Sequence, residues 1–440
     1  MSGLGTKADP ITPCEFTGLM RAYEPFESAA KVAVACSGGP DSMALVVLTQ
    51  DWVESVGGKL TALIVDHRLR DESTVEANSV AERVKSLGVE AVILTRSGSG
   101  PSANLQERAR EARYRLLFEW CAVNAVLHLL AAHHKDDQAE TVLMRLNRGS
   151  GDDGLAGMPV LQEFGPLRLL RPLLPITKSR LQATLDASGL KSEKDPSNDD
   201  LRFDRVRIRR RIKRSNSSAR WYKIGAKASI RRAARDDLMS SHLALNCEIY
   251  PEGYARLQSG FWRCASDEIT LRALSALIAA IGGRLHPLRR RKIRELYLKL
   301  DEDRLGGGAT SGGCRIVPEP NGSVLVMREI GLVRECASAC GRIKWDGRFD
   351  IDMPRKNLDY KIQALGSCGL RSIRDVQPNI GTTHIPKLVL ETLPAVWGLE
   401  GVMEVPHLSY LGQDSIGNGK IVSNICFAPT RPIQATRFTI

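Results

Sequence analysis

The sequence predicts an α/β fold: a doubly wound, mostly parallel sheet in the first half of the chain, then a helical linker or middle domain, then a small mixed α/β C-terminal domain. In the first half, short apolar runs alternate with segments of helical periodicity, which is typical of parallel strands joined by helices. A chain of 440 residues also exceeds one ordinary hydrophobic core. We therefore expect three domains, over residues 1–215, 216–305 and 306–440.

A glycine turn joins the first predicted strand, residues 32–36, to the first predicted helix, which begins at Asp41 or Ser42. Glycines in such a turn let the backbone approach an anion closely, and the first N–H groups of the helix point at that anion. The alternative is that Asp41 and Ser42 only cap a buried helix. The residues that we expect to bind phosphate are Ser37, Gly38, Gly39, Pro40, Asp41 and Ser42.

Three further apolar runs, at residues 59–65, 89–94 and 125–132, predict strands, and residues 73–87 predict a helix. Open α/β sheets bind their ligands at the carboxyl ends of the strands. Charged residues directly follow the first of these three strands, and we expect them to contact a nucleotide or substrate. They are Asp66, His67 and Arg70.

A strongly helical segment at residues 104–115 carries several arginines. Arg110 and Arg113 are three apart and therefore share a helix face, from which they could bind phosphate. The alternative is an ordinary solvated face, because Glu107 and Glu111 are interleaved with the arginines.

Two histidines and several carboxylates follow the apolar run at residues 125–132. A helix beginning near Asp136 would place its first turn at the carboxyl edge of the sheet, beside the glycine turn. His133 and Asp137 can meet if the backbone there is already helical, and with His134 they suit Mg²⁺ or phosphate chemistry. A zinc site is disfavoured, because the histidines are adjacent and no third ligand has a recognisable spacing. Helix capping by the acidic residues is the remaining alternative.

Basic residues exceed acidic ones, 62 against 50, which favours a polyanionic partner such as nucleic acid. They are dense over residues 202–235, a block that is either a disordered basic linker or a nucleic-acid contact surface. Because Val206 and Ile208 can pack, we expect an ordered contact at the start of this block and a linker further on. The expected contacts are Arg205, Arg207 and Arg209.

Residues 238–300 have helical periodicity, and residues 315–327 alternate like a hairpin. The ten cysteines include no Cys-x-x-Cys pair, which favours the reducing cytoplasm. The most apolar segment, near residues 271–281, is too short to span a bilayer, so we expect no membrane partner.

Taken together, these motifs resemble those of the tRNA(Ile)-lysidine synthetases, a family of N-type ATP pyrophosphatases with a Rossmann-like PP-loop fold. Residues 37–42 resemble the pyrophosphate loop, residues 65–70 the second motif, and residues 109–114 an arginine–tyrosine helix. Residues 133–141 and 195–198 complete the set in the expected order. The resemblance is close over about the first half of the chain and weak beyond it.

The resemblance implies a ligase that joins L-lysine to the wobble cytidine of the isoleucine tRNA with a CAU anticodon. ATP would be the co-substrate, and Asp41 would bind Mg²⁺. The C-terminal domain would recognise the tRNA, and we expect that the chain can form a homodimer. The implied catalytic residues are Asp41, Arg113, His133 and Asp137. The implied nucleotide or substrate contacts are Asp66, His67, Arg70, Arg110 and His134.

Two other functions stay open. A tRNA thiolation enzyme on the same fold would need a thiolate relay or an iron–sulfur cluster. The missing Cys-x-x-Cys and the apolar surroundings of Cys36 and Cys121 disfavour it. A non-catalytic tRNA-binding protein would have no chemical reason to retain Asp41, His133 and Asp137 together.

Overall fold

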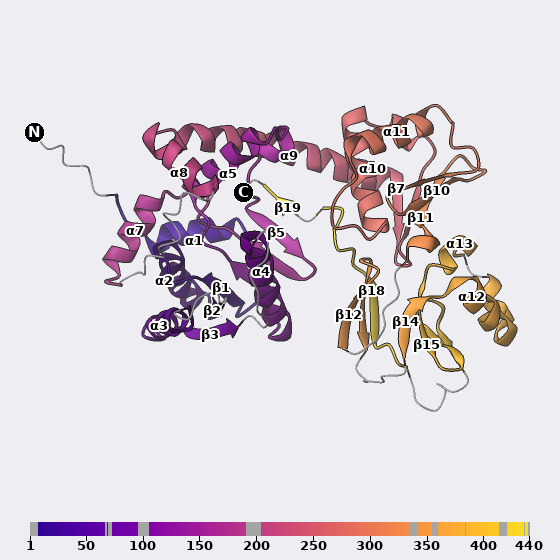
Figure 1. The fold of residues 1–440 in the computed structure, drawn as a ribbon, viewed down its shortest axis with the longest axis horizontal. Helices are drawn as coiled ribbons and strands as arrows, with labels where there is room; N and C mark the ends of the chain where they lie inside the picture. Colours follow the sequence, from indigo (N-terminus) through magenta and orange to yellow (C-terminus); the bar gives the residue numbers. More distant parts are fainter. Residues whose placement is uncertain are drawn as a thin grey trace, which may run out of the picture. The chain divides into compact units, whose positions relative to one another are not determined.

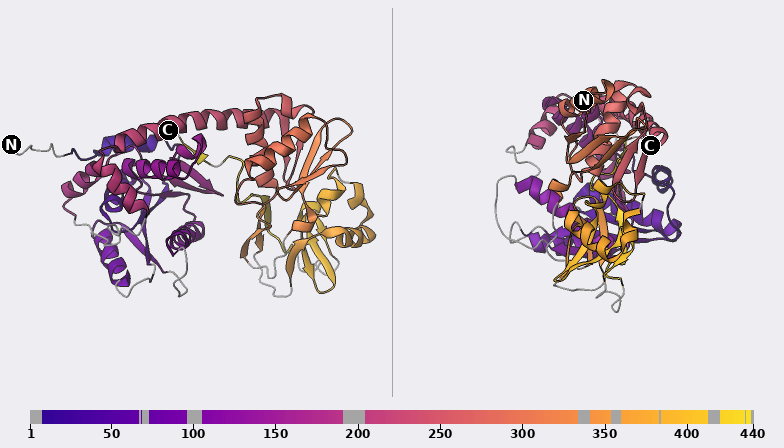
Figure 2. Two further views of the ribbon diagram at one scale, coloured as in Figure 1. Left: turned by 45° about the horizontal axis from the view of Figure 1, so that its top comes forward. Right: turned by 90° about the vertical axis from the view of Figure 1, so that its right-hand side faces the viewer.

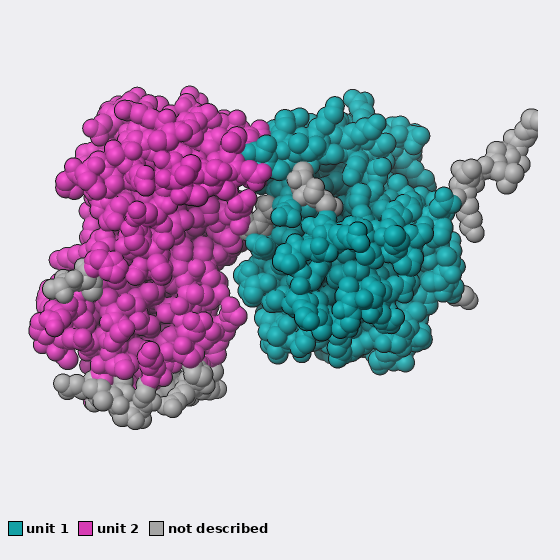
Figure 3. Space-filling model, turned by 180° about the vertical axis from the view of Figure 1, so that it is seen from behind, with its two compact units in different colours: residues 1–234, 436–440 teal, residues 235–435 magenta. Residues whose placement is uncertain are grey.

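The structure, a computed structural model, describes residues 8–66, 68, 73–95, 105–190, 204–333, 341–353, 360–382, 384–412, 420–434 and 436–438. The chain forms two compact units, which Figure 3 shows in different colours. One comprises residues 1–234 with 436–440, and the other comprises residues 235–435.

The first unit is built on a seven-stranded sheet with strand order β19-β5-β6-β4-β1-β2-β3. Its strands are β1 (Lys31–Cys36), β2 (Lys59–Asp66), β3 (Glu90–Thr95), β4 (His128–Leu130), β5 (Leu161–Phe164), β6 (Leu167–Leu170) and β19 (Thr436–Arg437). Its helices are α1 (Pro13–Arg21), α2 (Pro40–Ser55), α3 (Ser73–Lys85), α4 (Leu105–Val123), α5 (Lys135–Asn147), α6 (Asp152–Leu155), α7 (Lys178–Ala187) and α8 (Asp204–Arg214). The strands from β6 to β3 are parallel, and β5 and β19 form an antiparallel edge.

Strand β1 lies inside the sheet and is buried on both faces. Val32 and Val34 pack in one core with α1, α2, α3 and α7. Ala33 packs in a second core with Leu117 of α4. Helices thus cover both faces of the sheet, as the ribbon views show (Figure 1, Figure 2). The predicted doubly wound sheet is confirmed, and the carboxyl ends of its parallel strands meet at one edge.

The strands predicted at residues 59–65 and 89–94 are confirmed as β2 and β3. The run at residues 125–132 forms only the three-residue strand β4. Helix α4 continues to Val123, and Ala125 then takes a left-handed φ of 52°, which ends the extended backbone on that side.

The second unit contains three antiparallel sheets. The five-stranded sheet has the order β7 (Cys247–Tyr250), β8 (Tyr254–Leu257), β11 (Val324–Arg328), β10 (Cys314–Pro318) and β9 (Ala309–Ser311). The three-stranded sheet is β12 (Gly341–Trp345), β13 (Phe349–Met353) and β18 (Asn424–Phe427). The four-stranded sheet is β14 (Lys361–Ala364), β15 (Pro394–Gly398), β16 (Gly401–Val405) and β17 (Tyr410–Leu411).

The longer helices of the second unit are α10 (Asp267–Ile281), α11 (Arg290–Asp301) and α12 (Gly366–Val376), with a short α13 (Lys387–Leu390). Short 3₁₀ turns are η2 (Phe261–Arg263), η3 (Ile330–Leu332), η4 (Pro378–Thr382) and η5 (Pro406–Leu408). Helices α10 and α11 share one core with the five-stranded sheet. Helix α9 (Ser218–Asn246) continues across residue 234, where the two units divide.

The hairpin predicted at residues 315–327 is confirmed, because Arg315 pairs with Met327 between β10 and β11. The helical expectation for residues 238–300 is wrong at residues 247–257, which form the β7–β8 hairpin. Its turn contains Gly253 at a φ of 77°, and the rings of Tyr250 and Tyr254 stack at 4.3 Å across it.

The three-domain division at residues 215 and 305 stays a prediction. The five-stranded sheet takes strands from both sides of residue 305. Among the helices in the described ranges, none is both long enough and apolar enough to cross a membrane.

Candidate active site

The predicted phosphate loop joins β1 to α2. Gly38 has a φ of 77°, and a Cβ atom at this position would lie 2.3 Å from Cγ2 of Val80. The Ser42 hydroxyl donates to the carbonyl oxygen of Gly39 (2.9 Å) and accepts from the backbone N–H of Ser37 (3.2 Å). Because the N-cap of α2 is Gly39, the alternative of a helix capped by an acidic or hydroxyl side chain is not observed. The first N–H groups of α2 are therefore left to bind an anion.

Asp41 lies in the first turn of α2. Its Oδ2 atom is 3.5 Å from Nε2 of His134 and 3.9 Å from Nζ of Lys178. Its Oδ1 atom is buried and has no hydrogen-bond partner among the described residues. Burial would raise the pKa of Asp41, but the hydrogen bond and charge of His134, with the charges of Lys178 and Arg209, lower it overall. Asp41 is therefore ionised at neutral pH and keeps one unpaired oxygen.

His134 is the N-cap of α5 and is only 4% exposed. Its Nδ1 atom accepts from the backbone N–H of Asp136 (3.2 Å), and Nε2 lies 3.3 Å from Oδ2 of Asp137. With Nδ1 as an acceptor, a neutral His134 carries its proton on Nε2 and donates toward Asp41 and Asp137. Burial would lower the pKa of His134, but these carboxylates raise it. His134 thus links the first turn of α2 to the first turn of α5.

The expected pairing of His133 with Asp137 is not formed, although the structure describes both residues. Helix α5 begins only at Lys135, so His133 precedes it and the spacing of four does not bring the two side chains together. The Oδ1 atom of Asp137 instead accepts from Nη2 of Arg205 at 2.7 Å. The charged partners of Asp137 are therefore His134 and Arg205.

Arg205 and Arg209, one turn apart on α8, face α5. The Nε atom of Arg205 lies 2.8 Å from Oε2 of Glu140, and that of Arg209 lies 2.7 Å from Oε1. Glu140 is buried at 3% exposure, whereas the side chains of Arg205 and Arg209 are 37% and 36% exposed. The expectation that these two arginines meet tRNA stays a prediction; in the structure, carboxylates of α5 bind both of them.

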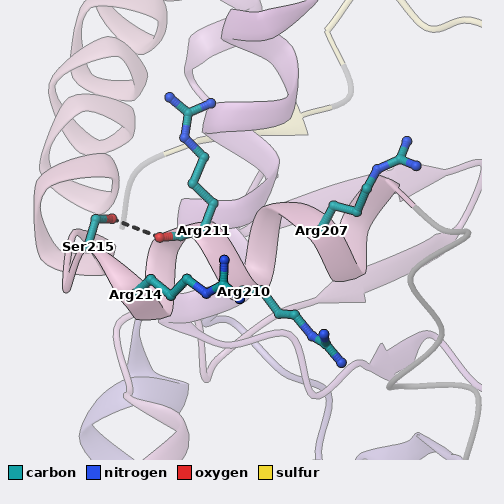
Figure 4. Close-up of a pocket in the computed structure, with 5 residues that line it drawn as sticks. All are labelled: Arg207, Arg210, Arg211, Arg214 and Ser215. Atoms are coloured by element: carbon teal, nitrogen blue, oxygen red, sulfur yellow. Dashed lines mark hydrogen bonds between the residues drawn. The ribbon is translucent and has the colours of Figure 1, made fainter.

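The opposite face of α8 is exposed and basic. A pocket of about 510 Å³ lies there (Figure 4), and its lining residues are Arg207, Arg210, Arg211, Arg214 and Ser215. Arg207 is paired with Asp204. Within the described part of the chain, no carboxylate lies in ion-pair distance of Arg210, Arg211 or Arg214. This surface has the charge and exposure that a polyanion requires.

Arg110 and Arg113 lie on one face of α4, as their spacing predicts. Their Cζ atoms are 5.1 and 5.6 Å from the ring centroid of Tyr114. His133 lies in the field of these arginines: burial and the charges of Arg171 and Arg110 hold its pKa well below the usual value. His133 is therefore a neutral imidazole at pH 7, and its buried Nδ1 atom has no partner among the described residues.

Asp66 ends β2 and is 2% exposed. Its Oδ1 atom accepts from the backbone N–H of Arg68 (2.9 Å) and from Ser73 Oγ (2.9 Å), and its Oδ2 atom accepts from Thr74 Oγ1 (2.7 Å). Two of these bonds tie Asp66 to the first residues of α3. Three other parts of the expected site lie outside the described residues, namely His67, Arg70 and the segment 195–198.

Known proteins resemble both units of this chain. Residues 15–216 match the model of the PP-loop domain family. The tRNA(Ile)-lysidine synthase of Ruegeria pomeroyi is 32% identical over 407 residues, which covers 88% of this chain and 91% of that protein. The chain belongs to the tRNA(Ile)-lysidine synthase family. The synthase of Orientia tsutsugamushi is 30% identical over 90% of this chain and 93% of its own length.

Family membership confirms the resemblance drawn from the motifs and extends it, because these relatives align beyond the PP-loop domain into the second unit. Among solved structures, a U34-tRNA thiolase from Methanococcus maripaludis is 18% identical. It covers 48% of this chain and 76% of that protein with a TM-score of 0.42, a likeness too low to bear on function.

Sequence reasoning did not single out Glu140, Lys178 or Arg171, although Glu140 lies within the matched motif at residues 133–141. Glu140 and Lys178 look like ordinary helix residues, and only the fold brings them to Arg205 and Asp41. Arg171 follows directly after β6, at the carboxyl edge of the sheet. The sequence signal that could have identified Arg171 is its position as a basic residue inside the apolar, proline-containing run of residues 167–176.

Proposed function

We propose that this chain joins L-lysine to C2 of the wobble cytidine, position 34, of the isoleucine tRNA with a CAU anticodon. The observation that carries the proposal is Asp41 at the N-terminus of α2: its Oδ2 is held by His134, and its Oδ1 is buried with no hydrogen-bond partner among the described residues. It supplies a positioned carboxylate beside an anion-binding helix end, which ATP cleavage requires.

The reaction has two balanced steps. First, the C2 oxygen of cytidine attacks the α-phosphorus of ATP, and the bond to the β-phosphate breaks to release pyrophosphate. The N–H groups of the loop and of α2 would stabilise the charge that develops on pyrophosphate. Second, the lysine ε-amine attacks C2, loses a proton and displaces AMP, which carries the former C2 oxygen away. The product is lysidine.

Asp41 has the chemistry to hold Mg²⁺. A single free carboxylate oxygen fits this ion, which is usually bound by one or two carboxylates together with substrate phosphates. When bound, Mg²⁺ would neutralise phosphate charge. His134 would keep Asp41 oriented toward it, and Arg113 would lie near the α-phosphate, with neutral His133 donating or accepting one hydrogen bond.

The tRNA contact of α8 is proposed for its outer face, through Arg207, Arg210, Arg211 and Arg214 (Figure 4). Arg205 and Arg209 would instead hold α8 against α5 through Glu140. We further propose that the second unit recognises the tRNA body, that the protein acts in the cytoplasm and that it can form a homodimer.

Thiolation is not favoured by the cysteines that the structure describes. Cys36, next to the loop, is buried, and burial raises the pKa of its thiol. Cys121 is also buried, which raises its pKa to about 12. In the same described ranges, no three metal-ligating side chains gather into a metal-binding group. A reactive thiolate therefore has no evident source at this site.

The variant Asp41→Asn tests the proposal at the first step. It should slow tRNA-dependent release of pyrophosphate from ATP, measured without lysine, by roughly 10²–10³-fold, because it removes a preorganised charge from the site. Asp51→Asn is a matched control on the exposed part of the same helix and should keep the wild-type rate. A wild-type rate for Asp41→Asn would remove Asp41 from the mechanism.

A further inference from the structure

A buried guanidinium lies at the carboxyl edge of the sheet without a carboxylate partner. Arg171 directly follows β6 and is 4% exposed. Its Nη1 atom donates to the carbonyl oxygen of Pro159 (2.9 Å), and its Nε atom is buried with no hydrogen-bond partner among the described residues. Because desolvation of a cation is costly, such a group normally has an anionic partner.

Among the described residues, the two other arginines that are as fully buried each pair with a carboxylate. In the second unit, Arg328 and Arg348 both donate to the carboxylate of Asp346. In the first unit, the half-buried Arg205 is bound by Asp137 and Glu140. Arg171 departs from this pattern, since no ion pair joins it to a carboxylate of the described residues.

The surroundings of Arg171 are polar, cationic and incompletely bonded. The side chain of Tyr114 lies beside Arg171 and Arg113, and its ring is 5.1 Å from the Cζ atom of Arg110. The hydroxyl of Tyr23 is buried and lies close to Arg171. Among the described residues, Nδ1 of the neutral His133 has no hydrogen-bond partner, and the charge of Arg171 helps to keep the pKa of His133 low.

We propose that Arg110, Arg113 and Arg171 form a binding site for one phosphate group, and that Arg171 is its buried member. Arginine binds phosphate through paired N–H groups, and an anionic phosphate here would supply the missing counter-charge. This site is separate from the loop of residues 37–42, which lies at the N-terminus of α2. Resting on the proposed function, it would hold either the α-phosphate of the nucleotide or a backbone phosphate of the RNA.

Two separate phosphate sites would let the protein hold the two parts of the cleaved ATP in different places. The loop would hold the departing pyrophosphate, and the arginine site would keep the other phosphate in place for the second step.

The test uses the full-length protein and the variant Arg171→Met, which keeps a long apolar stem and removes the charge. Since no carboxylate of the described residues pairs with the buried guanidinium, removing its charge should offset the loss of its single bond to Pro159, so Arg171→Met should melt at the wild-type temperature or above it. Its affinity for AMP or for an anticodon stem-loop RNA, measured by calorimetry, should fall by about tenfold to a hundredfold. Weaker AMP binding identifies the nucleotide phosphate, and weaker RNA binding alone identifies a backbone phosphate.

Arg145→Met is the matched control, because Nη1 of Arg145 donates to the carbonyl oxygens of Gly154 and Gly157. It should lower the melting temperature and leave both affinities unchanged. If Arg171→Met behaves in the same way, Arg171 is structural and the proposal is wrong. Should Arg171→Met not fold, Arg171→Lys decides: weaker binding supports the site, and wild-type affinity for both probes overturns it. These binding readouts need no lysine transfer, so they stand apart from failure of the proposed reaction.

Discussion

At the scale of single residues, two carboxylates of the first unit, Asp66 and Asp41, illustrate how a structural side chain differs from one available to a substrate. Both oxygens of Asp66 are occupied by donors from its own turn. Asp41 is held through one oxygen, and the other is buried and unpaired among the described residues. The unpaired oxygen makes Asp41 the better candidate for chemistry, and Asp66 the better candidate for stability.

Asp66 should contribute stability that depends on pH. Burial would raise its pKa, but hydrogen bonds from Arg68, Thr74 and Ser73 lower it overall. Its folded pKa is then below the unfolded value of about 3.9, so its contribution is present above pH ~4 and is lost as the pH falls through the folded pKa. Asp66→Asn should be less stable than wild type by about 1–3 kcal/mol at pH 7, and this difference should shrink in acid.

Denaturant unfolding at a series of pH values measures this difference. Asp51→Asn is a control of opposite sign, because burial and Glu54 raise the pKa of Asp51. A difference between wild type and Asp66→Asn that stays constant from pH 7 to pH 3 would contradict the assignment.

The sequence predicts site residues that belong to a local motif. It does not predict partners that are brought together only by the order of the strands or the exact start of a helix. The loop and Asp41 were found from their spacing alone. The partner of Asp137 was not, because it depends on α5 starting at Lys135 rather than earlier. In the sequence, Arg171 looks like one more residue of a buried strand. Only the pairing of β6 with β4, which ends shortly before His133, shows that Arg171 lies near His133 at the carboxyl edge of the sheet.

At the scale of elements, the loop needs glycine at Gly38 for two reasons, its φ and its contact with Val80. Gly88 has the same φ of 77°, but a Cβ atom there would have no neighbouring atom within 4 Å, so it isolates the first reason. Gly88→Ala should cost about 1–2 kcal/mol. Gly38→Ala should cost about 1–3 kcal/mol more, because its Cβ atom overlaps Val80.

Urea unfolding of the variants checks both values. In the double variant Gly38→Ala with Val80→Ala, the overlap is relieved, so the two single effects should not add. Simple additivity, or equal costs for Gly38→Ala and Gly88→Ala, would show that Val80 does not constrain the loop.

The sequence predicts that α8 is a basic contact surface. It does not show which arginines face α5 and which face solvent, because nearly every polar position of the helix is Arg or Lys. The buried Val206 and Ile212 and the carboxylate of Glu140 decide which arginines turn inward. Arg210→Ala and Arg214→Ala should each reduce the slope of log affinity for tRNA against log salt by about one, without a change in melting temperature.

Lys85→Ala, which removes one basic charge from α3, is the control and should leave the salt slope unchanged. Arg205→Ala should instead lower the melting temperature, at a cost of about 2 kcal/mol, because it strips one partner from the buried Glu140. A slope that responds to Arg205 and not to Arg210 or Arg214 would reverse the assignment of the two faces.

At the scale of the whole molecule, the chain returns to its first unit at the end. Residues 436–437 form β19 beside β5, and Phe438 packs with Ala156 and Ala228, with Cζ of Arg232 4.0 Å from its ring. The sequence pattern does not predict this strand, because two residues are too few to show periodicity. The relatives likewise align over both units.

Mass analysis of nucleosides tests the central claim most directly. The isoleucine tRNA with a CAU anticodon is incubated with the full-length protein, ATP and lysine, and its nucleosides are then compared with those of untreated tRNA. The account predicts that cytidine 34 gains the mass of lysine minus water, and that the gain requires both ATP and lysine. Exchange of oxygen for sulfur, or an unchanged cytidine, would contradict it.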